Sequence, residues 1–202
     1  TDRVAAAASA NLVGTPASFT RTPVVFGMPE PMAKALGWPD KPISITELEG
    51  LCQNPDGWGS VGKDIWGAFK ISKTNPNTST TGLSTILMQS YEASGKAEGL
   101  TSADVDAAAD FSRLFEECVI HYGDTTCNVL STLYDETQNG ANGSAYVSAV
   151  ALEETSLLNY NKGNPDSHTV QPGETLTPPK TKLVAVYPSG GSMWSDNPVT
   201  VL

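Results

Sequence analysis

The chain has 202 residues, of which 39% are hydrophobic, and it carries a net charge of −10. This length is typical of one domain, or of two small ones, and is enough to bury a sizeable core. The negative charge disfavours nucleic acids and anionic membrane surfaces as partners, because both are polyanions. No apolar run approaches the roughly 20 residues that cross a bilayer, so we expect no membrane insertion of this segment.

At both ends of the chain, the sequence pattern is that of a helix or strand that extends beyond the given residues. Residues 1–12 have the composition of the end of a helix, and residues 198–202 that of a strand. The start also lacks the charged and apolar regions of a signal peptide. We therefore expect this chain to be a segment of a longer protein.

The first part of the chain is predicted to form one strand and two short helices. The strand covers residues 18–28, where an apolar run follows a polar one. The first helix covers 29–37, with proline near its start and glycine at its end. The second begins after Ser44, which stands three residues before Glu47 in the spacing of a capping box. A glycine-rich loop over 54–63 follows it.

A polar loop over 73–82 is predicted to join a strand, residues 66–71, to a helix that ends near 94–96. The apolar residues of this helix recur at helical spacing and are expected to form its buried face: Leu83, Ile86, Leu87 and Tyr91. Hydroxyl residues dominate the loop itself: Thr74, Thr78, Ser79, Thr80 and Thr81.

This loop is the first candidate binding element. The first turn of a helix has N–H groups without intrahelical partners, and the helix dipole adds partial positive charge there. Gly82 has no Cβ and would let a ligand approach the backbone. A carboxylate, phosphate, sulfate or neutral polar group suits such a pocket. The alternative interpretation is that these residues are ordinary helix caps and turn residues.

The region after residue 100 is predicted to contain two helices separated by a second polar turn. Residues 101–104 open the first helix, and its apolar stripe continues until 122–123. The turn that follows places Thr125 and Thr126 at the start of the next helix. As in the first polar loop, small polar residues here lie beside the unpaired N–H groups of a helix start.

The last part of the chain is predicted to contain two strands and a helix. A buried strand over 145–150 leads through Ser148 to a helix that starts at 153–154, where two glutamates suit the helix dipole. A polar, proline-rich surface excursion covers 161–180, and a strand follows over 182–188.

This alternation of strands and helices is typical of a three-layer α/β fold with a mixed, mostly parallel sheet flanked by helices. Ligands of such sheets lie beyond the carboxyl ends of the strands. We expect the two polar turns and the segment around Ser148 to meet there. The candidate ligand-binding residues are Thr74, Asn75, Ser79, Thr80, Thr81, Gly82, Thr125, Thr126 and Ser148.

The cysteines leave two interpretations open. A disulfide between Cys118 and Cys127, which leaves Cys52 over, would suit an exported protein. Three small buried thiols are the alternative. Because no Cys-x-x-Cys pair occurs and the chain has only two histidines, we expect no zinc site, no other metal and no cofactor.

The sequence gives little support for a catalytic site. Cys118 and His121 would share a helix face, but a core cysteine beside a helix-terminal histidine is the commoner arrangement. Glu153 and Glu154 are adjacent and would diverge by about 100° on a helix, which makes them a poor pair for glycoside hydrolysis. Nucleophile-elbow, phosphate-loop and dinucleotide motifs are absent from the sequence. We therefore expect a protein that is not an enzyme.

Six segments, taken in their order and spacing, carry a resemblance to a known family. They are PVVFGMPEPMAKALGWP at 23–39, WGAFK at 66–70, TNPNTSTTGL at 74–83, HYGDTT at 121–126, YVSAVALEE at 146–154 and LVAVYP at 183–188. With them the chain resembles the extracellular solute-binding proteins of the type II periplasmic-binding fold. More narrowly, it resembles the bacterial solute-binding region that precedes a von Willebrand factor A domain in some actinobacterial surface proteins.

The resemblance implies a two-lobed binder that closes on a solute by a hinge motion. Residues 1–202 would form a single solute-binding-like domain, with the second lobe at about 19–195 and the ends as inter-lobe connections. The first lobe and the von Willebrand factor A domain would lie outside this chain.

The same resemblance implies a non-catalytic function for a small polar or anionic solute. The 74–81 loop would donate hydroxyl and backbone N–H hydrogen bonds, Thr125 and Thr126 would add to them, and Ser148 would contribute from a later strand end. Lys70 and Lys73 are candidates only, because strand lysines usually face water. The protein would be extracellular, on the cell surface or membrane-anchored as a lipoprotein, with a membrane transport partner. The alternative is an interaction module that binds a surface protein or a cell-wall polymer.

Overall fold

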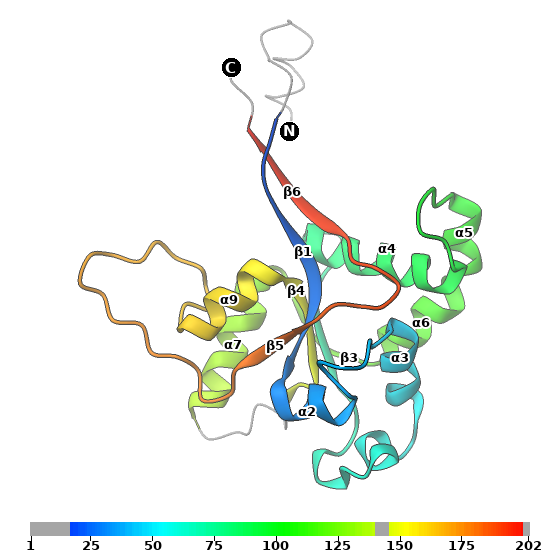
Figure 1. Ribbon diagram of the computed structural model, residues 1–202, viewed down its shortest axis with the longest axis horizontal. Helices are drawn as coiled ribbons and strands as arrows, with labels where there is room; N and C mark the ends of the chain where they lie inside the picture. The colour runs from blue at the N-terminus through cyan, green and yellow to red at the C-terminus, as the bar shows by residue number, and fades with distance from the viewer. Residues whose placement is uncertain (1–16, 140–145, 200–202) are drawn as a thin grey trace, which may run out of the picture.

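The computed structural model describes residues 17–139 and 146–199, so the expectations for residues 1–12 and for the 139–143 loop lie wholly or largely outside it. Six strands form its sheet, in the order β3-β2-β4-β1-β5, with β6 paired to β1 (Figure 1). The strands are β1 (Ala17–Pro29), β2 (Ile71–Thr74), β3 (Val119–Gly123), β4 (Ala149–Glu153), β5 (Leu183–Val186) and β6 (Trp194–Val199). The α-helices are α2 (Glu30–Ala35), α3 (Ile45–Gln53), α4 (Thr80–Ser94), α5 (Ser102–Ala107), α6 (Ala109–Glu117), α7 (Thr126–Gln138) and α9 (Glu154–Lys162). Two 3-10 turns, η1 (Gly57–Val61) and η2 (Asp64–Trp66), complete the described elements.

The sheet is mixed, and the helices flank it, which confirms the expected α/β class. Strand β2 runs parallel to both β3 and β4, so the parallel pairing is confined to the β3-β2-β4 half. Strand β1 runs antiparallel to β4, β5 and β6. Consequently the carboxyl ends of β2, β3 and β4 lie along one edge of the sheet.

Two hydrophobic clusters make the fold three-layered. Strand residues alternate between them, as the two-residue period of a strand requires: Phe26 faces one cluster and Val25 the other. The first cluster lies between the sheet and α2, α3, α4 and α6, and the second between the sheet and α7 and α9 (Figure 1). Within the described ranges, no helix is long and apolar enough to cross a membrane.

Strand β1 is exposed in its first half and buried in its second. The exposed half pairs with β6 in a two-stranded ribbon that runs away from the body of the molecule (Figure 1). Here Thr20 pairs with Asn197 and Thr22 with Ser195. Because both pairs have the same strand parity, their four side chains share one face of the ribbon.

The disulfide joins Cys52 at the end of α3 to Cys118 just after α6, with 5.9 Å between the Cα atoms. Both interpretations of the cysteines, a Cys118–Cys127 disulfide and three buried thiols, are therefore wrong, and Cys127 is a free thiol. Cys118 faces the first cluster against α3, whereas Cys127 lies in the first turn of α7, which packs on the opposite side of the sheet. Closeness in sequence did not translate into closeness in space.

Two strands lie where the sequence predicted other structure. Strand β2 begins at Ile71, where the predicted strand ends, because Trp66 closes a 3-10 turn and packs edge-on against buried Trp58 with 5.1 Å between ring centroids. The helix predicted to continue to 122–123 ends at Glu117, and β3 follows. In β3 half-buried and exposed residues alternate, which is the period of a strand and not of a helix.

The buried face of α4 also differs from the prediction. Leu83 is 49% exposed, and the buried positions include Thr81, Thr85, Met88 and Gln89. Most polar atoms on this face have partners: the Thr85 hydroxyl donates to the Thr81 carbonyl oxygen at 2.8 Å, and Gln89 Nε2 donates to Glu116 at 3.1 Å. Gln89 Oε1 has no partner among the described residues.

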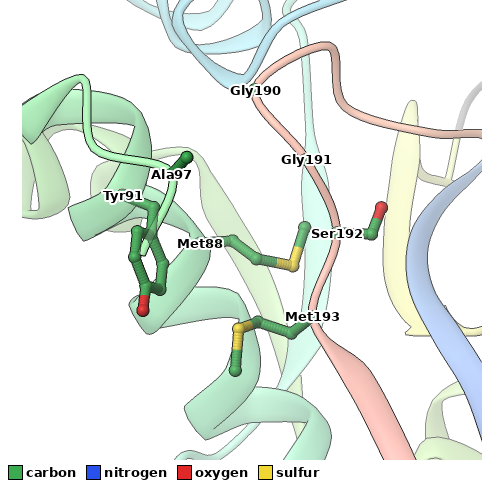
Figure 2. Close-up of a pocket in the computed structure, with 7 residues that line it drawn as sticks. All are labelled: Met88, Tyr91, Ala97, Gly190, Gly191, Ser192 and Met193. Carbon is green, nitrogen blue, oxygen red and sulfur yellow. The ribbon is translucent and has the colours of Figure 1, made fainter. Parts of the chain in front are cut away.

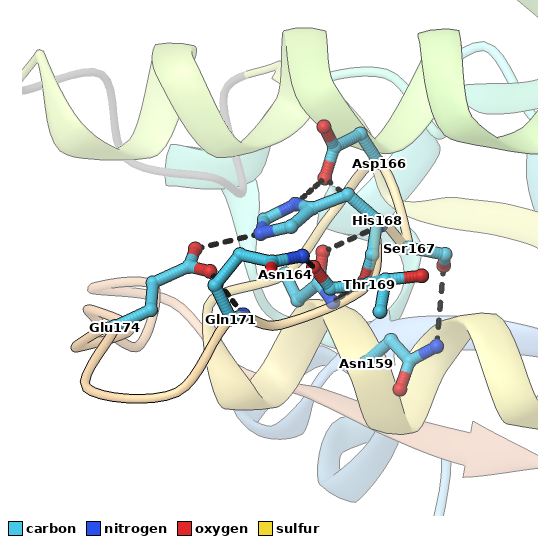
Figure 3. Close-up of polar contacts among 8 residues, drawn as sticks. All are labelled: Asn159, Asn164, Asp166, Ser167, His168, Thr169, Gln171 and Glu174. Carbon is cyan, nitrogen blue, oxygen red and sulfur yellow. Dashed lines mark hydrogen bonds and ion pairs between the residues drawn. The ribbon is translucent and has the colours of Figure 1, made fainter.

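The expected surface excursion is confirmed after α9, where residues 163–182 form a long irregular loop. His168 organises part of it (Figure 3). Its Nδ1 lies 2.7 Å from Asp166 Oδ1, and its Nε2 lies 2.7 Å from Glu174 Oε1. Asn164 fixes the His168 backbone by accepting from its N–H at 3.1 Å and donating to its carbonyl oxygen at 2.9 Å.

Candidate ligand-binding site

The carboxyl ends of β2, β3 and β4 are each followed by the start of a helix: α4 after a short turn, α7 after a shorter one, and α9 directly. The two polar turns lie side by side at this edge. Asn75 N–H donates to the Gly123 carbonyl oxygen at 2.9 Å, and the Thr78 hydroxyl lies 3.3 Å from the Asp124 carbonyl oxygen. Polar groups of the first turn are therefore used in hydrogen bonds to the second turn.

Glu153, the last residue of β4, joins this edge to both turns. The Thr81 hydroxyl donates to its Oε1, and the Thr126 hydroxyl donates to its Oε2 at 3.4 Å. The two hydroxyl oxygens are themselves 3.5 Å apart. From the sequence, Glu153 was interpreted as a charge suited to a helix start and rejected as half of a catalytic pair, and it was not among the candidate binding residues. Its place at the end of a buried strand was the signal that could have found it.

Three of the other candidates either have a structural role or have a side chain without a hydrogen-bond partner among the described residues. Thr74 is buried at the end of β2, and its hydroxyl has no hydrogen-bond partner in the part of the chain that the structure describes. Asn75 closes a turn by accepting from the Asn77 N–H at 2.9 Å. Thr125 caps α7, because its hydroxyl oxygen accepts from the Asn128 N–H at 3.2 Å.

Ser79 and Thr80 lie at the start of α4. Ser79 occupies the cap position, although its side chain makes no capping hydrogen bond. Thr80 is the exposed first residue of the helix.

Gly82 serves packing. A Cβ at this position would lie 2.3 Å from the Thr74 carbonyl oxygen and 2.9 Å from the Asn75 carbonyl carbon. Glycine is therefore needed for the close approach of α4 to the end of β2, not for the approach of a ligand.

Ser148 lies apart from the other candidates, because it precedes β4 at the amino end of that strand. Its Oγ accepts from Trp58 Nε1 at 2.9 Å and from the Lys70 N–H at 3.1 Å, and the residue is fully buried. The structure thus brings the two turns together but places Ser148 at the opposite end of the sheet.

Lys73 does not contribute to this edge of the sheet, because it forms an ion pair with Glu116. It is a strand lysine, but its side chain is fully buried and pairs with the Glu116 carboxylate. Burial lowers the pKa of Lys73, and the hydrogen bond and charge of Glu116 oppose that shift. It is therefore engaged on the face of the sheet covered by α6.

A polar recess of about 400 Å³ opens beside Glu153, between the ribbon and the start of α9. Every lining residue carries a hydroxyl, an amide or a carboxylate: Thr20, Thr22, Glu153, Thr155, Ser156, Ser195 and Asn197. The Thr22 hydroxyl oxygen accepts from the Thr155 N–H at 3.2 Å and lies 3.0 Å from the Thr155 hydroxyl. Local sequence patterns do not point to the ribbon residues, because only the β1–β6 pairing brings them here.

Of the two adjacent glutamates, only Glu153 lines the recess. Glu154 accepts a hydrogen bond from the Tyr187 hydroxyl. This bond is the main reason why the pKa of Tyr187 is raised to about 12.

A second hollow, of about 130 Å³, lies between α4 and residues 190–193 (Figure 2). Met88 and Met193 extend into it from its two sides, and Tyr91 lines its rim. This hollow is smaller and lies near the end of α4, away from the three helix starts. The recess beside Glu153 is therefore the better candidate for a polar ligand.

The comparisons with known proteins support the fold. No family model and no curated protein matches the chain. A solved ABC transporter structure from Clostridium perfringens matches 99% of this chain with a TM-score of 0.54 and 13% identity. A protein from Bordetella parapertussis, described as an extracellular solute-binding protein, matches 94% of it with a TM-score of 0.53 and 12% identity.

The chain spans less than half of these two proteins, 46% and 45% of their respective lengths. At such low identity the likeness extends to the fold alone. The chain therefore has the fold of one part of these transporter and solute-binding proteins.

Proposed function

We propose that this chain is a non-catalytic solute-binding domain that holds a small polar solute in the recess beside Glu153. The observation that carries the proposal is the recess itself: an open hollow of about 400 Å³ at the carboxyl edge of the sheet, whose seven lining residues all have polar side chains. Ligands of open α/β sheets bind at that edge. A few convergent polar groups in a concave site are typical of small-molecule binding.

The second part of the proposal is that residues of about 19–195 form the second lobe of a two-lobed binder. The β1–β6 ribbon would be the connection to the other lobe, and bending of this ribbon would close the two lobes over the solute. Support comes from the ribbon, whose β6 residues are almost all exposed. The recess lies at the base of this ribbon, where closure would cover it.

The proposed location is outside the cytoplasm. The Cys52–Cys118 disulfide supports it, because disulfides persist in oxidising compartments. Attachment to a membrane, a neighbouring von Willebrand factor A domain, an actinobacterial source and a membrane transport partner are further parts of the same proposal.

Thermal unfolding of the full-length protein with a panel of amino acids, amines, sugars and oxyanions tests the function. A ligand at 100 times its Kd should stabilise the protein by about 2.7 kcal/mol. Thr81→Val and Asn197→Ala should weaken that stabilisation, whereas Thr175→Val in the remote 163–182 loop should not. Equal stabilisation of all three variants would place the ligand elsewhere.

One observation favours a second candidate, a cell-surface interaction module. Phe19, Trp194 and Val199 are 78%, 60% and 53% exposed on the ribbon, and such apolar side chains mark contact surfaces. This function predicts that the full-length protein binds purified peptidoglycan or whole cells, and that Trp194→Ser abolishes the binding. Asn197→Ala is the matched control on the same strand and should leave it intact.

A further inference from the structure

We infer that Glu153 makes the recess selective for a solute that carries a protonated primary amine, and that it excludes anionic solutes. This inference rests on the proposed function and names the substrate class of that same site. It replaces the expectation of a polar or anionic solute with a narrower one.

The charge of the recess is the first argument. Among its lining residues, Glu153 alone carries a charge, and the other six are neutral. The nearest basic residue along the ribbon, Arg21, lies on the opposite face and is 3.6 Å from Asp196. Glu154, the next residue along the chain, is not a lining residue and accepts a hydrogen bond from the Tyr187 hydroxyl. An anion entering here would meet a carboxylate and no cation among the lining residues.

The use of the available donors is the second argument. An oxyanion needs hydrogen-bond donors, and a helix start usually supplies them. Here the hydroxyls of Thr81 and Thr126 already donate to the Glu153 carboxylate. The N–H of Thr155, in the first turn of α9, donates to Thr22. Glu153 thus holds the position that a bound anion would otherwise take.

The acceptors that remain are the third argument. A carboxylate oxygen accepts more than one hydrogen bond, and each oxygen of Glu153 receives only one from the described hydroxyls. An ammonium group offers three donors, and bonds between it and a carboxylate are charge-assisted. Glu153 would take one donor, and the hydroxyl oxygens of Thr20 and Ser195 or the Asn197 carbonyl oxygen would take the others.

The test compares matched probes on the full-length protein by titration calorimetry: putrescine against 1,4-butanediol, glucosamine against glucose, and succinate and sulfate as anions. We expect at least one amine to bind about tenfold or more tightly than its alcohol partner. The alcohol lacks the charge-assisted hydrogen bond to Glu153, and losing one such bond raises the Kd by about this factor. Glu153→Gln should abolish this preference. Glu98→Gln, an exposed glutamate away from the recess, should retain it.

The wild-type comparison does not depend on the variant, so it remains decisive if Glu153→Gln folds poorly. Tighter binding of the alcohols, sugars or anions, lost in Asn197→Ala, would overturn the inference and leave the proposed function standing. Absence of binding by every probe would count against both. Retention of the amine preference in folded Glu153→Gln would assign the selectivity to another group.

Discussion

Lys73 and Glu116 form an ion pair in which the lysine side chain is fully buried. Glu116 is also an acceptor for Gln89 Nε2 at 3.1 Å and for the Tyr122 hydroxyl. The pair therefore connects β2 to α6, α4 and β3. Because Lys73 directly precedes the last residue of β2, these contacts fix the strand end from which the first polar turn departs.

The first prediction concerns this pair. Glu116→Gln would leave the Lys73 charge buried without its counter-ion, and should lower the free energy of unfolding by about 3 kcal/mol. Lys73→Met should cost less, because Glu116 is partly exposed and keeps two other donors. Urea denaturation measures both. Equal losses in the two variants would contradict the role given to burial of the lysine.

The second prediction concerns the disulfide. Cys52 and Cys118 are separated by 66 positions in sequence, and closing such a loop should stabilise the protein by about 2–4 kcal/mol. Cys52→Ala and Cys118→Ala should both lower the urea midpoint, whereas Cys127→Ser should not. Peptide mapping without reductant should recover Cys52 linked to Cys118. A peptide linking Cys118 to Cys127 would contradict the structure.

The sequence predicted the fold well where each residue obeys its own local preference. The apolar run of β1, the proline and glycine that bound α2, and the cap of α3 by Ser44 are of this kind. Strand β2 was misplaced because its buried residues are polar and depend on distant partners. The Ser72 hydroxyl, for example, bonds to the carbonyl oxygen of His121. The local sequence around Ser72 does not predict such a partner.

The candidate site was predictable to a similar extent. Thr81 and Thr126 stand where helix-start patterns place hydroxyls, so the sequence could identify them. Glu153 joins them only because β4 lies next to β2 in the sheet. The side of the recess formed by Thr20 and Asn197 depends on a strand pairing that spans most of the chain. Local patterns carry no information about that pairing.

The third prediction uses the close packing of Gly82. A Cβ there would lie 2.3 Å from the Thr74 carbonyl oxygen, so Gly82→Ala should force α4 away from β2 and destabilise the protein by about 1–3 kcal/mol. Gly50→Ala in α3 is the matched control. Its Cβ would meet nothing within 4 Å, and alanine favours a helix by about 0.5–1 kcal/mol. The two glycines should therefore give opposite signs in urea denaturation. A neutral Gly82→Ala would show that the contact is not tight in solution.

The fourth prediction concerns the two histidines, whose pKa values should move in opposite directions. The hydrogen bond to Asp166 and then that to Glu174 raise the pKa of His168. Burial is the main reason why the pKa of His121 is lowered. An NMR titration of the two imidazoles should therefore place them on either side of the ordinary value of about 6.5. Asp166→Asn should shift the pKa of His168 downwards and leave that of His121 unchanged.

The sign of the His168 shift also fixes how the 163–182 loop responds to pH. A histidine with a raised pKa in the folded state contributes stability that is complete below about pH 6.5 and is lost as the pH rises through the folded-state pKa. The pKa values of Asp166 and Glu174 are lowered, mainly by their hydrogen bonds to His168 and Gln171, so both carboxylates stay ionised in mild acid. Hydrogen exchange corrected for its intrinsic pH dependence should therefore show a better protected loop at pH 6 than at pH 8. His168→Gln should remove the difference, and a difference that persists in this variant would assign it to another group.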